Sequence, residues 1–237
     1  SERRDLLVRS ELNAYLARLN RFPGRRVDAA LSPHEDGGAV LDYLVAERRP
    51  LLLYAQTSNT GTAQTDRWRY RLGLNYAQLT GNDDILSLEY VTAGFSESHA
   101  VNAGYEAPVA DLDLWRWRVG ASWNEFTASD VGFAGERFTG DSWTASAEIS
   151  RNVLQVDDLF VDAYAGLRWQ SISVQNRAVL IDGQTDLLLP AIGLRLEQRG
   201  RTRRTEGFVQ LERNLAGLAG TDDDDLNRLG RLFVDDE

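Results

Sequence analysis

Apolar residues alternate with polar ones along most of this chain, and the alternation is regular from residue 50 onward. In the segment 68–76, for example, every second residue is apolar: Trp68, Tyr70, Leu72, Leu74 and Tyr76. The residues between them are Arg, Gly or Asn. Successive side chains of a β-strand point to opposite faces, so this period of two predicts a strand with one apolar and one polar face. About nine such segments occur, many of roughly 9–12 residues, the length that a tilted strand needs to cross a bilayer.

The connections between these segments are of two kinds. A short polar turn lies at 81–84, whereas longer polar stretches lie at 124–141, 173–185 and 216–228. Alternating short turns and long loops are typical of bacterial outer-membrane barrels. The fold class that follows is mainly β, a partial transmembrane antiparallel β-barrel.

The first fifty residues follow a different period. From Arg4 to Asn20, apolar residues spaced by three and four predict an amphipathic helix, which Phe22-Pro23-Gly24 stops. These apolar residues are Leu7, Val8, Leu12, Tyr15, Leu16 and Leu19. Two short strands are predicted after it, over 27–31 and 40–46, with a turn at 32–38. This unit is too small to hold a core alone. We therefore expect residues 1–49 to be the end of a larger α+β domain and residues 50–237 to begin the barrel.

Composition narrows the function classes. The net charge is -10, which argues against a nucleic-acid partner because phosphate binding needs a basic patch. All 26 basic residues are Arg, and there is no Cys, so disulfides and thiolate metal sites are excluded. No apolar run reaches about 18 residues, so no transmembrane helix is predicted. Because the chain begins with Ser1 and shows no signal peptide, we expect its N-terminus to have been processed or cut.

The same alternation would serve a soluble barrel or sandwich whose apolar face is its core. Two features favour the membrane. Aromatic residues lie near strand ends, as in an interfacial belt, namely Trp68, Trp115, Trp123, Trp143 and Trp169. The polar face is also rich in charge, as expected for a wet lumen.

Charged residues on the polar face are candidates for lining that lumen. They are Arg67, Arg69, Arg71, Glu89, Arg116, Arg118 and Arg168. Five of these residues, Arg67, Arg69, Arg71, Arg116 and Arg118, could form a positive wall along which an acidic polypeptide slides. Alternatively, they form salt bridges across the lumen that stiffen the barrel.

The N-terminal unit offers a second candidate site. The strand carrying Val27, Ala29 and Leu31, beside the helix carrying Leu12 and Leu16, could accept an extended partner strand by β-augmentation. Alternatively, this edge pairs within its own domain.

Catalytic constellations are absent from the sequence. The two histidines are His34, in a polar turn, and His99, expected to begin a strand, and no HExxH, GxSxG or P-loop pattern occurs. The run Asp222–Asp225 lacks the spacing of an EF-hand loop and is interpreted as a solvated loop near lipopolysaccharide headgroups. We expect no enzyme activity, cofactor or metal.

Several motifs together resemble a known family. Residues 19–24 (Leu-Asn-Arg-Phe-Pro-Gly), followed by 27–33, resemble the end of the second POTRA domain in two-partner secretion transporters, the ShlB/FhaC-like TpsB proteins of the Omp85 superfamily. Residues 58–62 with Thr65, Trp68 and Arg69 resemble the family's first barrel hairpin, 81–88 the turn that follows, and 105–108 its Tyr-x-x-Pro. The resemblance runs from about Leu6 to Arg231.

The resemblance implies an outer-membrane pore that carries an unfolded secreted partner protein from the periplasm to the cell surface, passively and without nucleotide. POTRA domains in the periplasm would capture that partner. The family's lumenal loop with its Arg-Gly-Tyr/Phe signature is missing, and nine strands leave an open edge, so we expect a longer source protein. Three alternatives stay open: an Omp85-type insertase for other barrels, a porin-like or structural anchor in an envelope assembly, and a soluble β-sheet binding protein.

Overall fold

The computed structural model describes residues 8–34, 38–47, 49–61, 66–95, 98–112, 114–129, 137–176, 181–200 and 203–215. These residues form one helix and eleven strands. The helix is α1 (Arg9–Leu19), and the first two strands are β1 (Arg25–Pro33) and β2 (Ala39–Glu47). The others are β3 (Leu51–Ser58), β4 (Arg69–Ala77), β5 (Ile85–Ala93), β6 (Ser98–Pro108), β7 (Trp115–Ser129), β8 (Arg137–Val156), β9 (Leu159–Asn176), β10 (Ile181–Arg199) and β11 (Arg204–Glu212).

Helix α1 and the hairpin β1–β2 form an N-terminal module, as the spacing of apolar residues predicted. The two strands pair antiparallel over their whole lengths, from Arg25 opposite Glu47 to Pro33 opposite Ala39. The helix packs against β1, and Tyr15 meets Tyr43 of β2 edge-on, with ring centroids 6.1 Å apart. Most of β2 is exposed on both faces.

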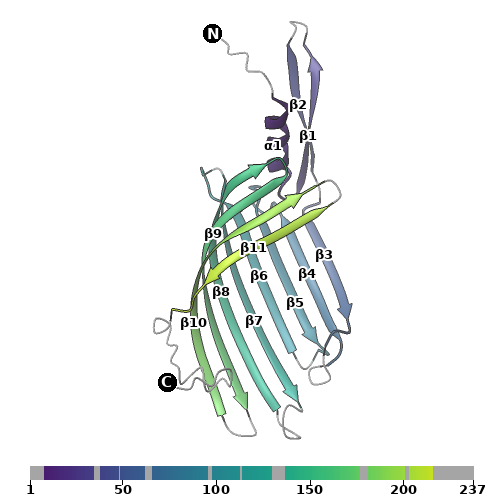
Figure 1. Ribbon diagram of the computed structural model, residues 1–237. Coiled ribbons are helices and arrows are strands. Elements are labelled where there is room, and N and C mark those ends of the chain that lie inside the picture. Colours follow the sequence, from purple (N-terminus) through teal and green to yellow (C-terminus); the bar gives the residue numbers. More distant parts are fainter. Residues whose placement is uncertain are drawn as a thin grey trace.

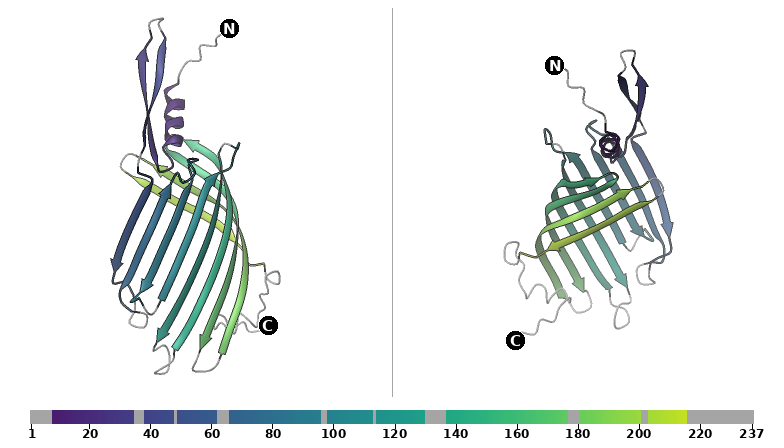
Figure 2. Two further views of the ribbon diagram at one scale, coloured as in Figure 1. Left: turned by 180° about the vertical axis from the view of Figure 1, so that it is seen from behind. Right: turned by 45° about the horizontal axis from the view of Figure 1, so that its top comes forward.

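Strands β3 to β11 form one antiparallel sheet in which every strand pairs with its neighbours in sequence. The sheet is strongly curved, so that β10 and β11 pass in front of the strands from the other half, and the N-terminal module stands beyond one end (Figures 1 and 2). The predicted nine strands are therefore confirmed, as the wall of a partial barrel.

The second half of the sheet departs from the predicted lengths. Strands β7 to β10 have 15, 20, 18 and 19 residues, because they run on through much of the stretches 124–141 and 173–185 that were predicted to be loops. The prediction was wrong because alternation fades where both faces of a strand are polar, while backbone pairing continues. The third predicted loop, 216–228, lies outside the described residues.

The two faces of the sheet differ in chemistry. The apolar residues of successive strands share one face and are exposed, with 65 % of Leu53, 60 % of Ile192 and 70 % of Leu211 accessible. The polar residues share the other face. A single loop, residues 20–24, contacts β7, β9 and β10 on that polar face, which a curved sheet permits only from its concave side.

The exposed convex face is therefore apolar and the concave face polar, which is the reverse of a soluble sheet protein. The interpretation as a soluble barrel with an apolar core is wrong. Among the described residues, no helix is long and apolar enough to cross a membrane.

Candidate functional site

Ion pairs run across the concave face from strand to strand. Glu106 of β6 pairs with Arg116 and Arg118 of β7 at 2.6 and 2.5 Å. Arg118 lies 3.8 Å from Glu148 of β8, which Arg195 of β10 also contacts at 3.1 Å. These groups link four strands of the wall, and each carboxylate lies between two cations.

The remaining predicted lumen residues fit this pattern with one exception. Arg71 and Glu89 pair at 3.5 Å, and Arg168 pairs with Glu212 of β11 at 2.5 Å. Arg69 opens β4 on the same face. Arg67 precedes the strand and is exposed, so the prediction that it lies on β4 was wrong.

Two tyrosines lie across glycines on this face. Tyr54 of β3 passes over Gly73 of β4 to donate a hydrogen bond to Glu89 of β5 at 2.9 Å. Tyr164 of β9 passes over Gly193 of β10 to Gln210 of β11 at 2.8 Å. A Cβ at Gly193 would lie 2.6 Å from the Tyr164 ring, so the glycine is needed for the crossing.

The mouth of the wall next to the N-terminal module carries the most buried charged cluster. The Arg21 guanidinium donates to both carboxylate oxygens of Asp162 on β9, at 3.0 Å from Nη1 and through a shorter contact from Nη2, and to Glu197 on β10 at 3.1 Å. Its side chain is 9 % accessible, and its charge lies over the Phe160 ring at 4.5 Å from the centroid.

The loop that presents Arg21 is held in shape by its own backbone contacts. Asn20 ends α1, and its side-chain amide exchanges two 2.7 Å hydrogen bonds with the backbone of Val27, as a strand partner would. Gly24 completes the turn with a φ of 112°, a conformation open to glycine. Phe22 is thereby placed under Arg116, whose guanidinium lies 3.8 Å from the ring centroid.

Further contacts attach the N-terminal module to the wall. Arg25 pairs with Asp83 of the β4–β5 turn at 2.7 Å, and Gln155 of β8 donates to the Ala14 carbonyl of α1 at 2.6 Å.

Burial by itself lowers the pKa of Arg21, but the hydrogen bonds and charges of Asp162 and Glu197 raise it above its usual value. Arg21 therefore stays charged, and it lies beside a cleft of about 480 Å³ between α1 and the strand ends.

A second buried carboxylate organises the β4–β5 turn. Asp84 is completely buried and accepts hydrogen bonds from the backbone N–H and hydroxyl of Thr80, both 3.0 Å long, and from Tyr105 at 3.1 Å. Burial raises the pKa of Asp84, but the bonds from Thr80 and Tyr105 outweigh burial, so the pKa lies below its usual value.

This turn should loosen in acid. The depressed pKa means that Asp84 stabilises the turn at pH values above the unfolded-state pKa of about 3.9, and that this contribution fades as pH falls through the folded-state pKa. Hydrogen exchange of the Thr80 amide should therefore be slow at pH 5 and become relatively faster toward pH 3, after correction for intrinsic exchange. Asp84→Asn should remove most of this pH dependence, and an unchanged profile in that variant would contradict the assignment.

All five predicted belt tryptophans point to the convex face or its rim. Trp123 and Trp143 are cross-strand partners with ring centroids 6.0 Å apart, and Trp169 lies on the next strand. Trp115 begins β7 at the end near the N-terminal module, whereas Trp68 lies before β4 at the opposite end. Trp117, which the sequence analysis did not select, packs against Tyr105 at 5.3 Å.

The two histidines lie at the ends of strands. His34 follows β1, and His99 is the second residue of β6 on the convex face. In the part of the chain that the structure describes, no three His, Asp or Glu side chains come together as a metal site would require. The run Asp222–Asp225 lies outside the described residues.

The fold and its two faces define the wall of an outer-membrane β-barrel. The family model that matches residues 37–186 is that of the haemolysin secretion/activation proteins ShlB/FhaC/HecB. The chain belongs to this family. Among the curated proteins, none matches.

Solved structures of similar fold agree with this assignment. CdiB from Escherichia coli superposes with a TM-score of 0.71 at 17 % identity, covering 90 % of this chain and 41 % of that one. CdiB from Acinetobacter baumannii superposes with a TM-score of 0.58 at 16 % identity, covering 81 % of this chain and 38 % of that one. BamA from Haemophilus ducreyi lacking POTRA domains 1–3 gives 0.55 at 13 % identity, covering 92 % and 44 %. The chain thus spans about two fifths of each of these proteins.

Proposed function

We propose that this chain is part of an outer-membrane pore that carries a secreted partner polypeptide from the periplasm to the cell surface. The family membership supports this proposal. The observation that carries it furthest is the continuous polar lining of the concave face, where ion pairs join β6, β7, β8 and β10. An unfolded chain exposes many backbone polar groups, and a wet, charged wall lets it pass without leaving them unsatisfied.

Transport through this pore is passive and uses no nucleotide, and the protein is not an enzyme. Among the described residues of the concave face, charged groups such as Arg71, Arg118 and Arg168 are held in ion pairs with carboxylates.

We further propose that the N-terminal module faces the periplasm and is the end of a POTRA domain, with residues 1–49 belonging to it and residues 50–237 to the barrel. The connections between barrel strands have two to seven residues on the module's side and four to ten residues at the other end, and the shorter connections are periplasmic in outer-membrane barrels. The edge of β1 that faces away from β2 then offers the partner a strand to pair with at Ala29 and Leu31, beside Leu12 and Leu16 of α1, whereas Asn20 already occupies this edge at Val27.

The two predicted roles of the arginines differ in geometry. A positive wall would leave their charges facing the lumen, whereas salt bridges place each arginine beside a carboxylate. Because Arg71, Arg116, Arg118 and Arg168 each lie beside a carboxylate, the geometry favours bridges that stiffen the wall. Replacing Arg67, Arg69, Arg71, Arg116 and Arg118 together by Gln should lower secretion while a folded barrel persists, and secretion at the wild-type rate would end the proposal of an arginine pathway. Glu89→Gln should act oppositely if a positive wall guides an acidic chain.

The transport proposal is tested by deleting the gene for the full-length protein and identifying the proteins secreted into the culture medium. Loss of one secreted protein, restored by the intact gene, supports transport. Normal secretion with a detached envelope assembly would instead identify an anchor, and a general loss of other barrel proteins would identify an insertase.

A further inference from the structure

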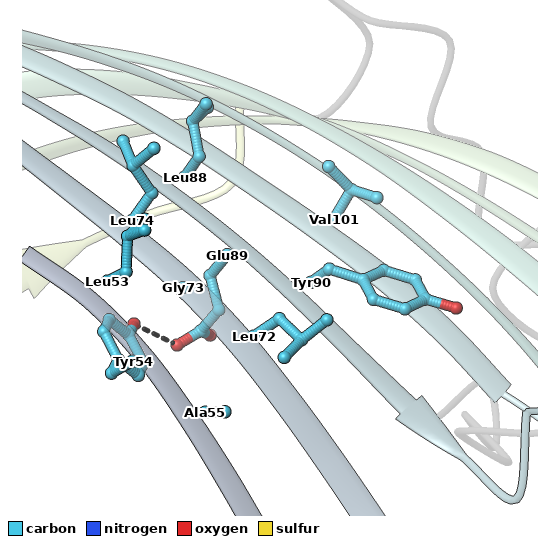
Figure 3. A pocket seen from close by; sticks show the side chains of 10 residues that line it. All are labelled: Leu53, Tyr54, Ala55, Leu72, Gly73, Leu74, Leu88, Glu89, Tyr90 and Val101. Carbon is cyan, nitrogen blue, oxygen red and sulfur yellow. Dashed lines mark hydrogen bonds between the residues drawn. The ribbon is translucent and has the colours of Figure 1, made fainter.

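The convex face carries a groove of about 650 Å³ over β3 to β6 (Figure 3). Two rows of apolar side chains border it, and each row follows cross-strand partners from one strand to the next. One row is Leu53, Leu74 and Leu88, and the other is Ala55, Leu72, Tyr90 and Val101.

The floor of the groove is backbone, because the residues between the two rows turn their side chains to the concave face. These residues are Tyr54, Gly73 and Glu89, and Tyr54 and Glu89 are joined there by their hydrogen bond (Figure 3). A hollow in a lipid-facing surface is filled by lipid hydrocarbon, since water finds no polar partners there.

Polar and aromatic groups mark one end of this groove. Tyr90 and His99 hydrogen-bond at 2.7 Å between the hydroxyl and Nδ1, their rings stack at 6.1 Å, and the hydroxyl of Thr92 lies 3.4 Å from the same Nδ1. Beside them Tyr70 stacks on Phe95 at 4.6 Å. When the Tyr90 hydroxyl donates to Nδ1, a neutral His99 ring carries its proton on Nε2, which is then a donor to a further group.

An apolar groove with a hydrogen-bond donor at one end, Nε2 of His99, fits an amphiphile with a headgroup rich in acceptor oxygens. Tyr90 and His99 lie toward the ends of β5 and β6 that are remote from the N-terminal module. With the orientation proposed above, on which this inference rests, that end lies in the outer leaflet. We propose that the groove binds one acyl chain of lipopolysaccharide, and that His99, held in place by Tyr90, donates a hydrogen bond from Nε2 to the phosphorylated sugar headgroup.

The proposal is tested on the purified full-length protein, stripped of lipid in detergent, with lipopolysaccharide and phosphatidylglycerol as the probes. Native mass spectrometry gives the dissociation constant of each. Two variants address the two ends of the site: Ala55→Phe fills the groove, and His99→Phe keeps the ring stacked on Tyr90 but removes both nitrogens. Ala165→Phe, on the convex face of β9, is the matched control, and heat-modifiable mobility on a gel verifies that each variant is folded.

Losing one hydrogen bond to a charged group costs a factor of about ten or more in affinity. We therefore expect His99→Phe to weaken lipopolysaccharide binding about tenfold. Ala55→Phe should also weaken it, by excluding the acyl chain, and the control should leave it unchanged. Phosphatidylglycerol should bind more weakly and without sensitivity to His99. Equal lipopolysaccharide binding by the wild type and both variants would overturn the proposal. So would phosphatidylglycerol binding that is equally tight and equally sensitive, which would assign the groove to phospholipid.

Lipid binding by the purified protein does not depend on export, so the lipid-binding proposal and the transport proposal can fail independently of each other.

The orientation of the barrel is tested with Asn82→Cys in the β4–β5 turn, which should react with an impermeant reagent only after the outer membrane is opened. Labelling of intact cells would overturn the proposed orientation, and with it the assignment to the outer leaflet.

Discussion

Arg21→Ala should release the N-terminal module from the barrel wall and reduce secretion strongly. Removing Arg21 leaves Asp162 buried with Asn152 as its nearest remaining partner, while Glu197 keeps Arg199 and Arg204. Removing one partner of a buried pair costs about 3 kcal/mol or more, which raises the detached population about a hundredfold. The rate at which a broad-specificity protease cleaves residues 20–26 of the folded protein reports that population.

Two further variants make this result specific. Arg26→Ala removes an exposed pair with Asp28 from the same segment and should change the cleavage rate little, since exposed pairs contribute about 0–1 kcal/mol. Arg21→Lys keeps the charge but loses the forked geometry and should fall between the wild type and Arg21→Ala. Equal cleavage of the wild type and Arg21→Ala would show that the pair does not hold the module.

Gly73→Ala should destabilise the barrel by about 2–3 kcal/mol, because an overpacked contact is added and a hydrogen bond to a carboxylate is lost. A Cβ at this position would overlap the Tyr54 ring, which would have to leave Glu89. The urea midpoint of the refolded full-length barrel measures the loss.

Gly104→Ala is the matched control on the same concave face, because a Cβ there lies 3.9 Å from its nearest neighbour, the Val119 carbonyl. It should shift the midpoint little. In a Tyr54→Ala background, Gly73→Ala should also cost little, and an additive loss in the double variant would show that the two residues act independently.

The strands were predictable because burial in lipid leaves a strict period of two in the sequence. The ends of β7 to β10 were not, since outside the bilayer both faces of a strand are polar and the period disappears. The helix of the N-terminal module was likewise predictable from its spacing and from the Phe-Pro-Gly sequence that ends it.

The sequence predicted which charged residues lie on the polar face, but it did not predict which of them pair with one another. Glu89 and the arginines of β4 and β7 follow from alternation, whereas the contact of Arg195 with Glu148 depends on the curvature of the sheet. Arg21 was missed as a functional residue, because a single arginine after a helix has no sequence signal for burial. Its partners Asp162 and Glu197 do occupy polar positions of two alternating segments, next to the strand ends that face the module.

The central claim is that lipid covers the convex face of the sheet and water the concave face. Single cysteines in place of adjacent small residues of β7 and β8 test it most directly. The chain has no native Cys, so Ala121→Cys and Ala145→Cys on the convex face can be compared with Ser122→Cys and Ser146→Cys on the concave face. In native outer membranes, a water-soluble maleimide should label the two serine positions and spare the two alanine positions, which lipid covers. Labelling of the alanine positions with protection of the serine positions would contradict the assignment of the polar face to the lumen.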